Sequence, residues 1–144
     1  MTPHIRLLAF GSAGHAAAVA LRRAVLRAPL GLDFAPGQLA AEAGDAHLGA
    51  FDGETLIGAA VLTPYGEGVC KLRQMAVSEA ARGTGAGAGL LAAAEAEARR
   101  RGARRVVLEA RLTARGFYER FGYAAEGGVF TQVTLPHILM AKSI

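Results

Sequence analysis

Apolar and polar positions alternate in short runs through the first part of the chain, and this pattern predicts a strand followed by a long helix. Residues 5–10 form the first apolar run and predict a strand. Residues 13–27 place Val19, Leu26 and several alanines at helical spacing, which predicts a helix with one buried stripe. Proline and glycine then recur through residues 29–37, so we expect an irregular stretch there.

The next apolar runs predict antiparallel strands. Residues 46–51 and 55–62 flank Asp52-Gly53, a dipeptide suited to the positive φ angles of a type I′ hairpin turn. Residues 64–68 contain another turn, and residues 72–77 then read as a further strand.

A glycine-rich loop at residues 82–87 opens the second half and leads into a strong helix over residues 88–101. Four apolar positions of this helix share one face, namely Leu90, Leu91, Ala94 and Ala98. Gly102 is placed to end the helix in a left-handed conformation.

The remaining pattern predicts a strand over residues 105–110 and a short helix over residues 113–121 that stops at Gly122. A last extended segment follows. We expect Pro136 to interrupt it and a strand to continue from His137 to Lys142.

Early hairpins and a late strand–helix–strand crossover together predict the fold class. We expect an α/β (α+β) fold with a mixed, mostly antiparallel sheet flanked by about four helices. A chain of 144 residues fits one domain, residues 1–144, and the sequence shows neither an internal repeat nor a linker.

Composition narrows the classes of protein. The chain is 52% hydrophobic, but alanine supplies much of this, and no apolar run approaches the roughly 18 residues of a membrane span. The first residues lack a signal-peptide pattern, and the single cysteine, Cys70, cannot form an internal disulfide. We therefore expect a cytoplasmic protein with no membrane partner and a buried Cys70.

The net charge of +4 favours an anionic ligand. Arginines cluster at residues 99–101 and 104–105, where a helix is predicted to end, so compensation of the helix dipole explains most of them. Aromatic residues are not interleaved with these arginines, and we predict no nucleic-acid partner. Histidine and cysteine show no metal-ligand spacing, so we predict no metal.

The glycine-rich loop is the first candidate for chemistry. Free amides at a helix N-terminus bind phosphate, glycines let that phosphate approach, and Arg82 adds a cation. A Walker loop would need lysine at Ala88. Residues 83–88 do fit a dinucleotide-binding G-x-G-x-x-A pattern, with Glu109 as a ribose ligand, although residues 78–82 separate the glycines from the strand. A purely structural turn stays equally open at this point.

Two motifs in order are more specific than the loop alone. Residues 82–87 read Arg-x-x-Gly-x-Gly after a Met-Ala-Val strand, and residues 114–123 look like an A-x-x-F-Y-E-K-x-G-F segment. With the helix and strand between them, they resemble the GNAT family of acyl-CoA N-acetyltransferases. The resemblance covers residues 46–142 well and residues 1–45 loosely. Residues 74–77 and 109–111, Pro136-His137 and Met140 look like small bacterial members of that family.

The resemblance implies transfer of the acetyl group of acetyl-CoA to a primary amine of a small molecule or peptide, by a monomer or homodimer. It implies that the pyrophosphate and pantetheine of CoA contact Met75, Ala76, Val77, Arg82, Gly83, Thr84, Gly85, Ala86, Gly87 and Arg111. Arg111 stands where many members carry asparagine, so it is a candidate to contact either CoA or an acidic substrate.

Tyr118 is the candidate general acid that protonates the leaving thiolate, because a phenol has a pKa of about 10, close to that of a thiol. A backbone amide near Val77 is a candidate to stabilise the oxyanion. Candidate bases for the amine are His137, Glu126, Glu109 and His47, which flank strand ends. Two other interpretations are a catalytically silent acetyl-CoA-binding domain and a nucleotide-binding module.

Overall fold

A single seven-stranded sheet organises the computed structural model, which describes residues 2–144. The strands are β1 (His4–Leu8), β2 (Ala46–Asp52), β3 (Thr55–Pro64), β4 (Val69–Val77), β5 (Arg105–Arg111), β6 (Ala124–Gln132) and β7 (Leu135–Ser143). Their order across the sheet is β1-β2-β3-β4-β5-β7-β6. Every neighbouring pair is antiparallel except β4 and β5. The mixed, mostly antiparallel sheet predicted from the sequence is confirmed.

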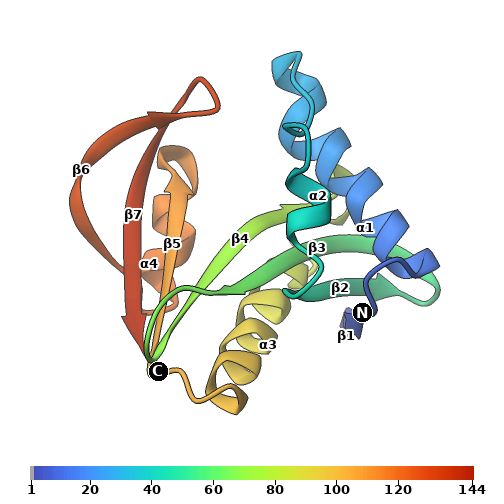
Figure 1. Ribbon diagram of the computed structural model, residues 1–144. Coiled ribbons are helices and arrows are strands. Elements are labelled where there is room, and N and C mark those ends of the chain that lie inside the picture. Colours follow the sequence, from blue (N-terminus) through green and yellow to red (C-terminus); the bar gives the residue numbers. More distant parts are fainter. Residues whose placement is uncertain (1) are drawn as a thin grey trace.

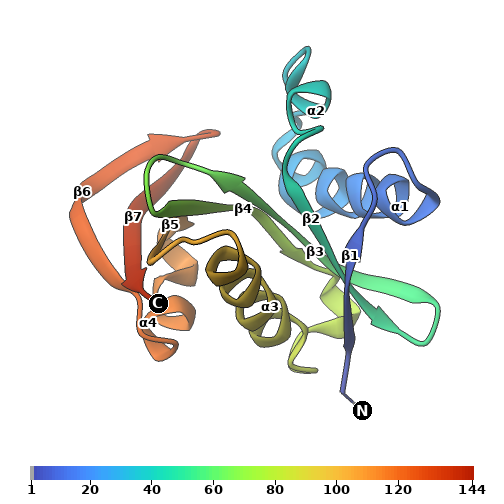
Figure 2. The ribbon, with the colours of Figure 1, turned by 60° about the horizontal axis from the view of Figure 1, so that its bottom comes forward.

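Helices cover both faces of this sheet (Figures 1 and 2). The α-helices are α1 (Ala13–Arg22), α2 (Gln38–Ala41), α3 (Ala86–Arg100) and α4 (Arg115–Arg120). A π-helical turn, Arg23–Arg27, extends α1 and completes the long helix predicted over residues 13–27. Figure 2 shows α1 and α2 on one face and α3 and α4 on the other. Within residues 2–144, no helix is both long and apolar enough to cross a membrane.

The main core lies between α3 and the sheet. The predicted apolar face of α3 is confirmed, because Leu90, Leu91, Ala94 and Ala98 are all buried. Small residues let the helix sit close to the strands, since a Cβ added at Gly58 would lie 3.0 Å from a methyl carbon of Leu90. Burying a leucine side chain of this kind contributes roughly 1.5–3 kcal/mol. Cys70 is buried in the same core, as expected.

The predicted type of the turn between β2 and β3 needs correction. Asp52 pairs with Thr55, so the β2–β3 loop consists of Gly53 and Glu54, and only Gly53 has a positive φ angle, +60°. A type I′ turn needs two such residues, and the predicted turn type is therefore wrong although the hairpin is right.

The final segment also differs from its prediction. Pro136 lies inside β7, opposite Thr131 of β6, and does not interrupt the strand. The chain reverses instead at Val133 and Thr134, whose φ angles are 44° and 66°. Pro136 is tolerated because it is the second residue of β7, and pairing of β7 with β5 begins only at the next residue.

Candidate functional site

The sheet opens between β4 and β5, its only parallel pair within residues 2–144. The two strands pair over four positions, which end at Leu72 and Leu108. Beyond this point β4 continues to Val77 and β5 to Arg111 without further pairing. Figure 1 shows the two strands diverging. The two strands therefore splay apart over their last residues.

A bulge in β4 accounts for the divergence. The register of β3 against β4 shifts between Ala59 and Val61, so that Gln74 and Met75 of β4 are both accommodated opposite Ala60. Gln74 has a φ angle of 55°, which is uncommon for a residue other than glycine. An extra residue bends the bulged strand and increases its twist. The end of β4 therefore turns away from β5 while it remains paired with β3.

A cavity of about 330 Å³ lies at the splay. It is lined by residues 71–75 of β4, residues 108–111 of β5, Leu26, Arg27, Gln38, Ala114, Tyr118, Gln132, Val133 and His137. Successive residues of a strand point to opposite faces of the sheet. Because consecutive residues of both strands line it, the cavity passes from the α1–α2 face toward the α4 face. The cavity is therefore accessible to ligands from both sides of the sheet.

Tyr118 reaches the cavity from α4. Its side chain is 7% exposed and packs edge-on against the rings of Phe117 and Tyr123. Burial raises the pKa of Tyr118 to about 12. The phenol therefore keeps its proton at neutral pH, and no side chain or backbone group in residues 2–144 forms a hydrogen bond with its hydroxyl group. Tyr118 therefore lies in the cavity wall with its proton in place, as the predicted general acid requires.

The glycine-rich loop leads into α3 with its backbone accessible. Gly83 and Gly85 have φ angles of 81° and 90°, and a Cβ at either would meet nothing within 4 Å. The first hydrogen bond of the helix runs from the amide of Gly89 to the carbonyl of Gly85. The amides of residues 86–88 precede that bond and point out of the helix N-terminus, where they can bind an anion.

This loop lies beside the splay rather than within the cavity. Residues 83–87 do not line the cavity. Gly87 forms the connection, because a Cβ there would lie 3.3 Å from the ring of Phe117 and 3.9 Å from Val77. The loop, the end of β4 and α4 therefore meet next to the cavity. Arg82 is exposed at the start of the loop.

The four candidate bases separate into two groups. His137 and Glu109 line the cavity. Glu126 forms an ion pair with Arg105 and does not line it. His47 packs against the ring of His15 and donates through Nε2 to the carbonyl oxygen of Glu42 at 2.9 Å, also outside the cavity wall.

His137 is the better placed of the two that remain. Glu109 pairs with Lys71 and accepts a hydrogen bond of 2.6 Å from Gln132, so its carboxylate is already engaged. His137 is 4% exposed, and its Nδ1 lies 2.9 Å from the carbonyl oxygen of Leu135. A carbonyl can only accept, so Nδ1 carries the hydrogen and Nε2 holds the free lone pair in the neutral ring. That nitrogen can accept a proton.

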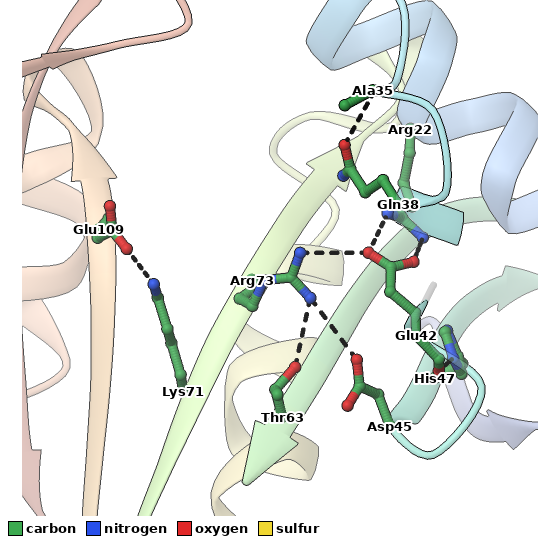
Figure 3. Close-up of polar contacts among 10 residues, drawn as sticks. All are labelled: Arg22, Ala35, Gln38, Glu42, Asp45, His47, Thr63, Lys71, Arg73 and Glu109. Carbon is green, nitrogen blue, oxygen red and sulfur yellow. Dashed lines mark hydrogen bonds and ion pairs between the residues drawn. The ribbon is translucent and has the colours of Figure 1, made fainter. Parts of the chain in front are cut away.

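A network of ion pairs supports the α1–α2 side of the cavity (Figure 3). Arg22 and Glu42 form a bidentate pair with both distances at 2.9 Å, and their side chains are 1% and 2% exposed. Arg73 of β4 joins Glu42 at 3.3 Å, Asp45 at 3.6 Å and the hydroxyl group of Thr63 at 3.3 Å. The network fixes α1, the segment after α2, and β4 relative to one another.

The sequence analysis did not find these cavity residues on the N-terminal side. Arg27, Gln38 and Arg73 belong to no motif and lie in segments that read as ordinary helix, loop and strand. The sequence offers one indication of a polar site in this region. Arg22 falls on the buried side of an alanine-rich helix, where a charged residue needs a partner.

Arg111 is one of the predicted cofactor-binding residues. Its guanidinium donates to the carbonyl oxygen of Leu26, in the π-helical turn after α1, at 3.0 Å. This contact crosses the cavity to the α1–α2 side.

Comparisons with known proteins agree with this fold. The model of the Acetyltransferase (GNAT) family matches residues 20–123. A structure of a candidate N-acetyltransferase from Lactobacillus plantarum is 28% identical, with a TM-score of 0.86 and 99% of each chain covered. ElaA from Escherichia coli is 20% identical, with a TM-score of 0.83, and the match covers 99% of this chain and 100% of that one.

A third similar structure contains a ligand. It is a GNAT family acetyltransferase from Elizabethkingia anophelis with acetyl-CoA bound, 15% identical, with a TM-score of 0.75 and 99% of each chain covered. At this identity the likeness concerns the fold alone. The comparison with curated protein sequences found no match.

Proposed function

Because the chain belongs to the acetyltransferase (GNAT) family, we propose that it transfers the acetyl group of acetyl-CoA to a primary amine of a small molecule or peptide. One observation carries this proposal: a cavity passes through the sheet where β4 and β5 separate, with Tyr118 and His137 both in its wall. Such a passage can hold a thioester from one side and admit an amine from the other.

The free edge of β4 fits the pantetheine arm. Beyond Leu72 this edge no longer pairs with β5, although Ala76 and Val77 still pair with β3 on the other side. Their outward backbone groups can therefore form hydrogen bonds with the amides of an extended ligand, as an added strand would. Met75, Ala76 and Val77 would hold the arm, and an amide near Val77 would stabilise the oxyanion.

The loop before α3 fits the pyrophosphate. The free amides of Ala86 and Gly87 lie at the positive end of a 15-residue helix. Arg82 supplies a permanent charge, and Gly83 and Gly85 leave room for phosphate oxygens. Thr84 completes the loop, where its hydroxyl group donates to the carbonyl of Ala81 at 2.5 Å.

His137 and Tyr118 would perform the two proton transfers. His137 takes the extra proton of the ammonium form through Nε2, and the neutral amine nitrogen then attacks the thioester carbon. The C–N bond forms, the C–S bond breaks, and Tyr118 donates its proton to the leaving sulfur. The acylated nitrogen releases its second proton to solvent. The products are an N-acetyl amine and CoA with a free thiol, and solvent returns both side chains to their starting states.

A screen of amines tests this function. Amino acids, polyamines, aminoglycosides and peptides would be incubated with acetyl-CoA, while free thiol is detected and the N-acetyl product is identified by mass spectrometry. We expect thiol release that depends on one class of amine. Tight acetyl-CoA binding without acetylation of any amine would instead support a catalytically silent CoA-binding domain.

A further inference from the structure

Two guanidinium groups on the α1–α2 side of the cavity have no carboxylate partner. Arg27 and Arg111 both line the cavity, and neither forms an ion pair within residues 2–144. Both donate to one acceptor, the carbonyl oxygen of Leu26, at 3.3 Å from Arg27 and 3.0 Å from Arg111. The two positive charges are therefore held side by side.

Arg27 is the more informative of the two. It is 8% exposed, and its one hydrogen bond goes to the carbonyl of the preceding residue. A guanidinium has five N–H donors, and a buried arginine ordinarily has a paired anion. Burial first, and then repulsion from Arg111, lowers the pKa of Arg27. An anion between the two groups would relieve that repulsion.

The other charges around this side of the cavity compensate one another. Five cations and three carboxylates line the cavity or belong to the ion pairs behind it: Arg22, Arg27, Lys71, Arg73 and Arg111 with Glu42, Asp45 and Glu109. Arg22 pairs with Glu42, Lys71 with Glu109, and Arg73 with Asp45. The excess of two positive charges is located on Arg27 and Arg111.

We infer that Arg27 and Arg111 bind a carboxylate of the acceptor, and that the acceptor is a small amine of the amino-acid type. The inference rests on the proposed function for the role of the amine. Planar guanidinium groups match a carboxylate through paired hydrogen bonds. The cavity volume of about 330 Å³ is at the lower end for small-molecule sites, which favours a compact acceptor.

The placement also orients the amine. Arg111 pairs in register with His137 across β5 and β7, so the two side chains project from the same face of the sheet. A carboxylate held by Arg27 and Arg111 leaves the amino group, one or a few carbons away, near the imidazole of His137. Arg27 and Arg111 are thus assigned as specificity-determining residues, and His137 as the group that receives the proton.

A binding experiment tests the inference independently of turnover. N-acetyl derivatives of the amino acids, and the C-terminal amides of the same compounds, would be titrated calorimetrically into the full chain with CoA present. The amides keep the shape and lack the charge. We expect at least one N-acetyl amino acid to bind about tenfold or more tightly than its amide, as one charge-assisted contact requires.

Substitutions of Arg27 and Arg111 then test whether these two residues cause the preference for the carboxylate. Arg27→Gln and Arg111→Gln should each remove the preference for the carboxylate, whereas Arg27→Lys should retain part of it. Arg23→Gln is the matched control, because Arg23 lies in the same π-helical turn, is exposed and pairs with Asp33. That variant should bind the panel like the wild type. Thermal unfolding of each variant checks that it is folded.

The inference is overturned if no N-acetyl amino acid binds more tightly than its amide, or if both glutamine variants keep the preference. Acetyl transfer to amines that lack a carboxylate, without any carboxylate preference in binding, would leave the proposed function intact and remove only the carboxylate site. Conversely, a carboxylate preference in binding without any thiol release would retain the anion site and overturn the proposed transfer reaction.

Discussion

Leu72 and Leu108 are the last residues at which β4 and β5 pair, and the next three residues of each strand line the cavity. The ladder ends there because the bulge at Gln74 bends β4 away. One backbone irregularity therefore produces both a free strand edge, which can pair with a ligand, and a space in which acyl transfer can take place. The proposed chemistry depends on this local departure from regular sheet geometry.

Tyr118→Phe tests the proposed acid. The hydroxyl group has no hydrogen-bond partner within residues 2–144, so its removal should change the melting temperature little while kcat falls about 10²-fold. The KM for acetyl-CoA should change little, because the lost interaction matters in the transition state. A well-folded variant with wild-type kcat, and with chemistry shown to limit the rate, would refute the assignment.

The dependence of kcat on pH tests the protonation state of Tyr118. Because the pKa of Tyr118 is raised to about 12, its proton should remain in place throughout the assay range. The wild-type kcat should therefore rise with pH, as more amine is neutral, and should not fall between about pH 8 and 10. A descending limb in that range which Tyr118→Phe removes would mean that the phenol ionises much more easily than its burial indicates.

His137→Gln tests the proposed base. Glutamine keeps a polar side chain of similar length and cannot take up the proton, so kcat should fall by about 10²-fold at neutral pH. The deficit should shrink at higher pH, where the amine loses its proton without help. His47→Gln is a matched control outside the cavity and should retain the activity of the folded fraction. An equal deficit at every pH would argue for a structural role of His137.

Gly85→Asp tests the phosphate loop, with Gly85→Asn as its control. Both side chains meet open space and carry the same backbone strain, because φ is 90° at this position. Only aspartate adds a negative charge beside the expected pyrophosphate. Acetyl-CoA affinity should fall at least tenfold for aspartate, about 1.4 kcal/mol, and clearly less for asparagine. Equal affinities in the two variants would indicate that the loop is only a structural turn.

The sequence predicted those parts of the molecule that depend on local pattern. Leu90 and its helical neighbours identified the buried face of α3, and Gly102 its end, because apolar spacing and a left-handed glycine act within a few residues. The same reasoning identified the glycine loop and the helix that bears Tyr118. The two motifs, through their resemblance to a family, gave the order of the elements around them.

Other features were beyond the reach of the sequence because they depend on distant contacts. The bulge at Gln74 arises from the register of β3 against β4, which no propensity of Gln74 predicts. The ion pair of Arg22 with Glu42 joins residues 20 positions apart, and the contact of Arg111 with Leu26 spans 85. The predicted interruption at Pro136 is wrong because the sequence alone does not distinguish a proline tolerated near the start of a strand from one that ends a strand.

The most direct test of the central claim is a titration of ¹⁵N-labelled protein with acetyl-CoA, followed through the backbone amide signals. The account predicts that the largest shifts fall in two segments, residues 73–77 at the free edge of β4 and residues 83–88 at the start of α3. Signals of β1 and of the β2–β3 turn should stay unchanged and serve as the internal reference. Saturable binding that leaves residues 73–77 unperturbed would contradict the placement of the thioester between β4 and β5.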